Sequence, residues 1–217
     1  MPASRASPYI NPLVYNGTAC DYLDFLRQTS GFLPPDATPS LWPVTAEHII
    51  LIGAMGVGKS SVGRKLAKKL KRPFFDSDQV IEEKTGVDIA TIFDYEGESG
   101  FRKREEKAID ELCRRQAMVL ATGGGAVLTA PTRKLLATCG TVIYLKASVD
   151  MLLKRTRHSD HRPLLNVPDK RQVITELLHQ REPLYLQTAD HTIDTDRRTV
   201  SWTANRVLQL LDLTPEP

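Results

Sequence analysis

The sequence is poor in the residues that mark metal sites and disulfide frameworks. Its three cysteines are Cys20, Cys113 and Cys139, and no two of them form a C-x-x-C pair. We therefore expect reduced thiols and a cytoplasmic protein, with neither a disulfide framework nor a structural zinc site. The five histidines form no H-E-x-x-H motif, which excludes the common zinc-protease pattern.

Long apolar runs are also missing. No stretch approaches the roughly 20 apolar residues of a membrane-spanning helix, and the N-terminal part has no apolar segment typical of a secretory signal. Asp21, Asp24 and Asp36 make this part a poor transit peptide, because such peptides are poor in acidic residues. The net charge of +3 is too small to indicate nucleic-acid binding by itself. We expect neither a membrane nor a nucleic acid as partner.

Prolines set the first part of the chain apart from the rest. They recur throughout residues 1–46 and interrupt regular structure. One segment near residues 18–31 fits a short helix in which Tyr22, Phe25 and Leu26 share a face. Two interpretations stay open for this extension. We favour a loosely ordered tail over an arm that docks its aromatic side chains on the remaining domain or on a partner.

From residue 47 onward, apolar runs alternate with helical patterns. Strands are expected at residues 48–52, 73–75, 118–121, 141–145 and, more weakly, 191–193. Helices are expected at residues 61–71, 79–84, 88–94, 98–116, 131–138, 149–155, 170–186 and 202–211. This alternation predicts one α/β domain over residues 47–217, with a parallel sheet covered by helices on both faces.

A phosphate-binding loop follows the first predicted strand. Residues 53–60 read G-A-M-G-V-G-K-S and fit the pattern G-x-x-x-x-G-K-[ST]. Glycines let successive backbone N–H groups point at phosphate oxygens, and the following helix presents its positive end to the same anion. Lys59 supplies a cation for the β- and γ-phosphates, and Ser60 a hydroxyl for Mg²⁺. The preceding strand and following helix favour this interpretation over a flexible glycine turn.

Two carboxylates, Asp76 and Asp78, follow the second predicted strand. Ligands of open α/β sheets bind beyond the carboxyl ends of the strands. One carboxylate there can hold Mg²⁺, which prefers oxygen ligands, and the other can orient or deprotonate a substrate hydroxyl. A helix cap is the alternative role. The neighbouring phosphate loop favours a functional role for this pair over a cap alone. Many phosphate-loop enzymes hold Mg²⁺ with an aspartate at the end of a strand next to the loop. The third strand here ends without an aspartate, so we assign the metal to Asp76.

Three glycines and a basic loop complete the candidate site. Residues 123–125 are consecutive glycines, typical of backbone that comes close to a ligand or another segment, and we favour close approach to the acceptor over a mobile turn. Residues 154–162 carry one lysine, three arginines and two histidines, typical of a lid over phosphates. A solvated basic loop is the first alternative and a nucleic-acid patch the second. The sequence lacks the N-K-x-D motif of GTPases and the signature motif of transporter ATPases.

Taken together, these motifs resemble those of the shikimate kinases. The matching stretches are residues 53–60, F-D-S-D at 75–78, G-E and F-R at 97–98 and 101–102, G-G-G-A-V at 123–127, R-P-L-L at 162–165 and R-E-P-L-Y at 181–185. Their order and spacing agree over about residues 47–212. Residues 1–46 have no counterpart in a minimal member of this family. Within the lid, about residues 156–168, the segment between Arg155 and Arg162 is the family's variable region.

The resemblance implies a three-layer phosphate-loop kinase fold with a five-stranded parallel sheet in the order 2-3-1-4-5 and a mobile lid. It implies a monomeric cytoplasmic enzyme that phosphorylates the 3-hydroxyl of shikimate with ATP and Mg²⁺, in aromatic amino-acid biosynthesis. The implied nucleotide site comprises Gly56, Val57, Gly58, Lys59, Ser60, Ser61, Arg155, Arg162 and Arg198. Shikimate would be bound by Asp78, Arg102, Gly124 and Arg181, and Mg²⁺ by Ser60 and Asp76. Lys59, Asp78 and Arg162 would be the catalytic residues.

Two other functions stay open on the residues alone. A gluconate or nucleotide kinase of the same fold would share the phosphate loop, but a nucleotide acceptor would need base-reading groups where this chain has Arg102 and Arg181. A degenerate domain that only senses a ligand would not need Lys59, Asp76 and Asp78 intact. We therefore favour the small-molecule kinase.

Overall fold

A five-stranded parallel sheet forms the centre of the computed structural model, which describes residues 48–157 and 169–213. The strands are β1 (His48–Ile52), β2 (Phe74–Asp76), β3 (Val119–Ala121), β4 (Gly140–Lys146) and β5 (His191–Asp194). They are arranged in the order β2-β3-β1-β4-β5, and every neighbouring pair is parallel. The structure therefore confirms the expected sheet and its strand order.

Strand β1 occupies the middle of the sheet and is fully buried. Ile50 lies beside Leu120 of β3 and Val142 of β4. All five residues of β1 are buried, as expected for an apolar run covered on both faces. Because side chains alternate along a strand, Ile49 joins the core on one face of the sheet and Ile52 the core on the other.

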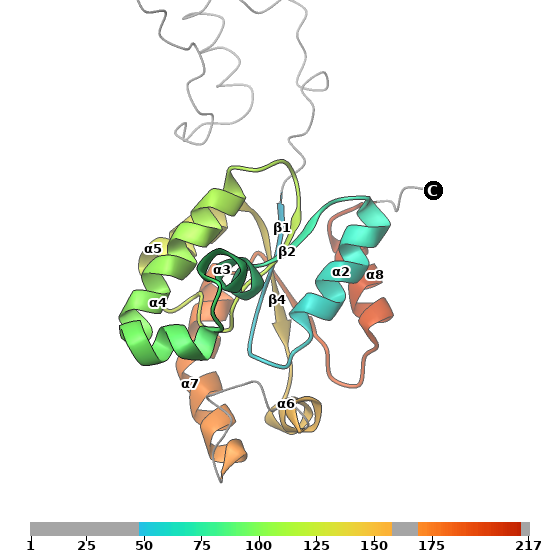
Figure 1. Ribbon diagram of the computed structural model, residues 1–217. Helices are drawn as coiled ribbons and strands as arrows, with labels where there is room; N and C mark the ends of the chain where they lie inside the picture. Colours follow the sequence, from blue (N-terminus) through green and yellow to red (C-terminus); the bar gives the residue numbers. More distant parts are fainter. Residues whose placement is uncertain (1–47, 158–168, 214–217) are drawn as a thin grey trace, which may run out of the picture. The chain divides into compact units, whose positions relative to one another are not determined.

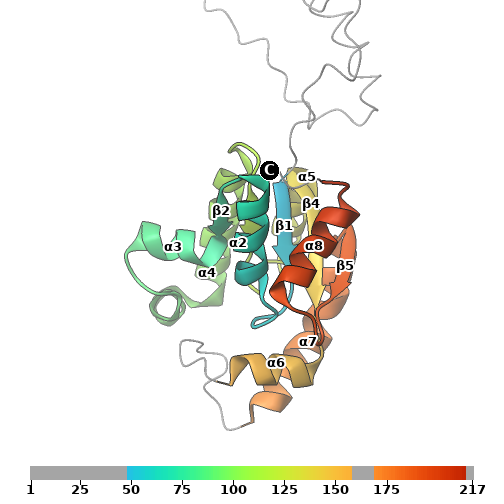
Figure 2. The ribbon, with the colours of Figure 1, turned by 90° about the vertical axis from the view of Figure 1, so that its right-hand side faces the viewer.

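Seven helices in the described part cover both faces. They are α2 (Lys59–Leu70), α3 (Ser77–Thr85), α4 (Ile89–Cys113), α5 (Ala130–Cys139), α6 (Val149–Thr156), α7 (Lys170–Thr188) and α8 (Val200–Leu210). Helices α2 and α8 pack side by side on one face, as Figures 1 and 2 show, while α4 and α5 cover the other (Figure 1). The phosphate loop joins β1 to α2, so it lies at the carboxyl edge of the central strand.

The helix boundaries agree with the predicted ones to within three residues. The patterns at residues 88–94 and 98–116 correspond to the two helical segments of α4, which meet at a kink at Gly97 with non-helical φ of 67°. This left-handed conformation favours glycine, so the bend is located where the sequence supplies one. Helix α7 continues through Pro183 to Thr188, two residues beyond the predicted end.

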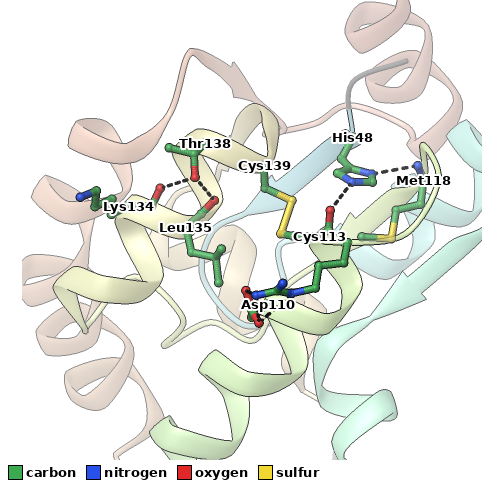
Figure 3. The surroundings of a disulfide bond; sticks show 9 residues. His48, Asp110, Cys113, Met118, Lys134, Leu135, Thr138 and Cys139 are labelled. Atoms are coloured by element: carbon green, nitrogen blue, oxygen red, sulfur yellow. Dashed lines mark hydrogen bonds and ion pairs between the residues drawn. A yellow bond between two sulfur atoms is a disulfide. The ribbon is translucent and has the colours of Figure 1, made fainter. Parts of the chain in front are cut away.

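A disulfide joins Cys113 at the end of α4 to Cys139 at the end of α5, contrary to the expectation of reduced thiols (Figure 3). The two Cα atoms are 5.5 Å apart, within the range that a disulfide requires. The sequence rule fails because the two cysteines are distant in sequence and are brought together by adjacent helices. The cysteine content therefore no longer supports the predicted cytoplasmic location.

The disulfide lies next to a buried histidine that ties two neighbouring segments together (Figure 3). The Nδ1 atom of His48 accepts a hydrogen bond from the backbone N–H of Met118, at 3.2 Å. Its Nε2 atom is 3.2 Å from the carbonyl oxygen of Cys113. Since Nδ1 is the acceptor, the neutral ring donates through Nε2. His48 therefore links the start of β1 to both the end of α4 and the start of β3.

Several predictions lie outside the described residues. They are the extension at residues 1–46 with its short helix, most of the lid and Arg162. The domain boundary near residue 46 also stays a prediction. No helix in the described part is long and apolar enough to cross a membrane.

Candidate functional site

A cavity of about 1050 Å³ opens at the carboxyl edge of the sheet. The phosphate loop lines one part, and side chains from α3, α4 and α7 line another. The predicted residues that line it are Gly56, Val57, Gly58, Lys59, Ser60, Ser61, Asp76, Asp78, Arg102, Gly124, Arg155, Arg181 and Arg198. The structure thus brings together every predicted site residue that it describes.

The phosphate loop is closed around its own lysine. Gly58 precedes α2 with φ of 105°, a backbone conformation that residues other than glycine rarely adopt. The Nζ atom of Lys59 donates to the carbonyl oxygens of Gly53, at 2.7 Å, and Ala54, at 3.0 Å. The side chain is 8% exposed. The loop therefore holds a buried cation at the start of α2, where a phosphate group is favoured.

Ser60 and Asp76 meet, although sixteen residues separate them in sequence. The Ser60 hydroxyl donates to Oδ2 of Asp76 at 2.6 Å. The other carboxylate oxygen, Oδ1, accepts from the backbone N–H of Asp78 at 3.2 Å and caps α3. One oxygen of Asp76 therefore caps the helix, while the other faces the phosphate loop. Binding of Mg²⁺ by Asp76 stays a prediction.

Asp78 and Glu105 form a buried acidic pair against Gly123. A side chain at Gly123 would place its Cβ 2.6 Å from both Oδ1 of Asp78 and Oε1 of Glu105, so the two carboxyl groups would have to shift to make room for it. Burial raises the pKa of Asp78 from its ordinary 3.8 to about 7. Repulsion from Glu105 and Asp76 adds to this, whereas Lys59 and Arg102 oppose it. Burial likewise raises the pKa of Glu105, against the attraction of Arg102.

Glu105 also holds the Arg102 guanidinium in place. Nη1 of Arg102 donates to Oε2 of Glu105 at 2.6 Å, and Nη2 donates to Oε1 of Glu98 at 3.0 Å. The Glu105 side chain is 1% exposed, so its ion pair with Arg102 is shielded from water. Gly125 lies against the guanidinium, where a Cβ atom would clash with it. Arg102 is thus fixed between two glutamates and a glycine.

Gly124 lies between the phosphate loop and α7. A Cβ atom on Gly124 would be 3.2 Å from the backbone nitrogen of Met55. Its carbonyl oxygen accepts a hydrogen bond from the Tyr185 hydroxyl. The three glycines therefore lie close to Asp78 and Glu105, to the phosphate loop and to Arg102 respectively. Contact with an acceptor molecule stays a prediction.

Arg155 and Arg198 also line the cavity. Arg155 donates to the carbonyl oxygen of Val57 at 2.9 Å and to that of Thr195 at 2.7 Å. It thereby joins α6 to both the phosphate loop and the segment after β5. The Arg198 guanidinium lies 4.4 Å from the centre of the Trp202 ring. The predicted contacts of both arginines with adenine stay predictions.

Glu105 and Tyr185 were not among the residues predicted for the site. One signal for Glu105 was present, because it falls on the apolar stripe of α4 formed by Phe101, Ala108 and Leu112. A charged residue on such a stripe is buried and needs a partner. Tyr185 lies in the R-E-P-L-Y stretch that carries the resemblance, but that match does not reveal where its hydroxyl points.

Comparison with known proteins now decides the family. The family model described as shikimate kinase matches residues 55–212. The chain belongs to the shikimate kinase family. Shikimate kinase of Legionella pneumophila (strain Corby) is 51% identical over 168 residues, which are 77% of this chain and 96% of the relative. That of Thioalkalivibrio sulfidiphilus is 54% identical over 153 residues, or 70% and 80% of the two chains.

Solved structures agree with this assignment. Shikimate kinase from Acinetobacter baumannii, in complex with shikimate, is 47% identical and matches with a TM-score of 0.75, over 77% of this chain and 93% of that protein. Shikimate kinase from Bacteroides thetaiotaomicron matches with a TM-score of 0.73 at 30% identity, over 77% and 99%. The comparisons confirm the predicted family, its fold and its ATP-dependent phosphorylation of shikimate.

Proposed function

We propose that ATP binds at the phosphate loop and that shikimate binds among Asp78, Arg102 and Arg181, with its 3-hydroxyl toward the γ-phosphate. One observation carries this assignment. Oδ1 of Asp78, Oε1 of Glu105 and Nε of Arg181 are buried without a hydrogen-bond partner in the described part of the chain. Buried polar atoms are nearly always paired, so these atoms favour a ligand with both hydroxyl donors and a carboxylate acceptor.

The two arginines would grip the shikimate carboxylate. A planar guanidinium donates two parallel hydrogen bonds to a carboxylate and thereby fixes its orientation as well as its position. Arg102 comes from α4 and Arg181 from α7, so the two side chains reach the cavity from different elements. Glu105 acts as a positioning residue, because it holds the guanidinium of Arg102. Gly124 would contribute a backbone contact to the acceptor.

Asp78 would align the acceptor hydroxyl and take its proton. With a pKa of about 7, a large fraction of Asp78 is ionised near neutral pH and can accept a proton. Phosphoryl transfer passes through a loose transition state, so positioning and charge neutralisation supply most of the catalysis. Asp78 therefore matters first for the direction of attack and second as a base.

The phosphate side neutralises charge. Lys59 would turn from the loop carbonyls to the β- and γ-phosphates, and Arg162, outside the described residues, is proposed to reach them from the lid. Arg155 and Arg198 are proposed to flank adenine. Ser60 and Asp76 fit Mg²⁺ because their oxygen atoms lie side by side and this ion keeps water and phosphate oxygens as its other ligands. When bound, Mg²⁺ would neutralise charge on the phosphate oxygens.

The decisive test changes the acceptor and the arginine together. Lysine keeps the charge at position 102 but loses the planar fork, so Arg102→Lys should raise KM for shikimate about tenfold or more and leave KM for ATP nearly unchanged. A shikimate analogue without its carboxylate should be a poor acceptor for the wild type and should lose much less from the same substitution.

Arg104→Lys is the matched control. Arg104 lies two residues along α4, is exposed and pairs with Glu96 away from the acidic pair of the cavity. It should leave the kinetics of both acceptors unchanged. If the losses from the analogue and from Arg102→Lys simply multiply, then Arg102 does not contact the carboxylate and the proposed orientation is wrong.

A further inference from the structure

The Tyr185 side chain is fixed from two directions. Its ring stacks on Tyr144 of β4, with ring centres 5.0 Å apart and an interplanar angle of 22°, and both residues are 1% exposed. Its hydroxyl donates a hydrogen bond to the carbonyl oxygen of Gly124. Burial raises the pKa of this hydroxyl to about 12, although the charge of Arg181 opposes the shift. The hydroxyl therefore stays protonated and remains a donor at physiological pH.

This hydrogen bond determines the direction of a whole peptide unit. The carbonyl of Gly124 and the N–H of Gly125 belong to the same planar peptide group, and in a trans peptide they point in opposite directions. The described part of the chain contains no cis peptide bond. Holding the Gly124 carbonyl toward Tyr185 therefore directs the Gly125 N–H away from it. Glycines have no Cβ to restrict these rotations. The Gly123 N–H is held by Oγ of Ser77 at 2.9 Å, and the Tyr185 hydroxyl holds the carbonyl of the next residue, Gly124.

The anchored peptide lies between the other parts of the site. Gly124 packs against the backbone of Met55 in the phosphate loop, and Gly125 packs against the guanidinium of Arg102. Both glycines line the cavity. Tyr185 also lies one helical turn after Arg181 on α7, so the two side chains emerge from the same side of that helix. One hydroxyl thereby relates α7 to the glycine segment and, through it, to the phosphate loop.

We propose that Tyr185 is a positioning residue, whose hydroxyl orients the Gly124–Gly125 peptide so that its N–H is presented to the bound acceptor. This inference rests on the proposed function, in which Gly124 and Arg181 contact shikimate. It adds a specific consequence: without the hydroxyl, the acceptor site should loosen while the nucleotide site keeps its affinity. If the hydroxyl were merely structural, its removal would lower the stability of the fold and would leave the ratio of KM for shikimate to KM for ATP unchanged.

The test removes the hydroxyl and keeps the ring. Tyr185→Phe should raise KM for shikimate about fivefold to tenfold, in line with the loss of one neutral hydrogen bond. KM for ATP should change less than twofold. Amide hydrogen exchange of the segment containing residues 123–125 should become faster in the variant, because the hydrogen bond that holds the Gly124 carbonyl is lost.

Two further variants separate the possible outcomes. Tyr144→Phe removes the hydroxyl of the other ring in the same stack, and it should leave KM for both substrates unchanged. Arg181→Lys tests the proposed function itself, and it should raise KM for shikimate. If Arg181→Lys has this effect but Tyr185→Phe does not, the role of Tyr185 is wrong and the acceptor site stands. If Arg181→Lys has no effect, the proposed acceptor site is wrong. Equal effects of the two tyrosine substitutions would mean that Tyr185 is only structural.

Discussion

Asp78 should destabilise the fold at neutral pH, because its buried carboxyl group must lose a proton there. In the folded chain its pKa is about 7, against an ordinary value of 3.8. At a pH between these two pKa values, Asp78 is protonated in the folded state and has released its proton in the unfolded state. Wild-type stability should therefore fall by about 1.4 kcal/mol for each pH unit as the pH rises toward 7, and then level off.

The Asp78→Asn variant carries no titrating group at this position. Relative to the wild type, it should gain about 3 kcal/mol in free energy of unfolding between pH 5 and pH 8, because about two pH units of this slope fall in that interval. The same substitution removes the charge that aligns and deprotonates the acceptor hydroxyl. We expect turnover to fall at least a hundredfold while ATP binding is largely kept. Stability and activity should thus change in opposite directions.

Urea denaturation of the two proteins at pH 5 and pH 8, without ligands, measures this effect. The quantity compared is the difference in unfolding free energy between variant and wild type at each pH. Asp150→Asn is the control, because its side chain is 77% exposed and its difference should not grow with pH. A difference for Asp78→Asn that stays constant between pH 5 and pH 8 would refute the reasoning from burial. Loss of ATP binding with shikimate binding kept would reverse the roles of Asp76 and Asp78.

Two shorter predictions concern the phosphate loop and the disulfide. Lys59→Ala removes a cation beside the phosphoryl group that is transferred, so turnover should fall about a hundredfold or more. Near-normal turnover of this variant in a coupled ADP-release assay would exclude the loop as the catalytic phosphate site. Cys139→Ser should lower the unfolding free energy by about 3.5 kcal/mol, the entropy of closing the 26-residue loop. Reduction of the wild type with a dithiol should lower its free energy of unfolding by the same amount. If the oxidised wild type and the variant are equally stable, Cys139 does not form a disulfide with Cys113.

Local sequence patterns identified most of the fold and much of the site. Apolar runs without charges predicted buried strands, and helical periodicity predicted the covering helices, because both patterns report which side chains are removed from water. The phosphate loop could be recognised because its glycines, Lys59 and Ser60 act within one short segment. Asp76 and Asp78 could be placed at the carboxyl edge of the sheet because they directly follow a strand.

Only the tertiary structure decided which distant groups meet. The sheet order places β3 between β2 and β1, so Asp78 after β2, Gly123 after β3 and the phosphate loop after β1 converge at one edge. Glu105 joins them from α4, and its charge is tolerated there because Arg102 pairs with it in the same buried space. Cys113 and Cys139 meet because α4 and α5 end side by side, a proximity that sequence spacing does not encode. Each of these contacts depends on the packing of whole elements, and local periodicity carries no information about that packing.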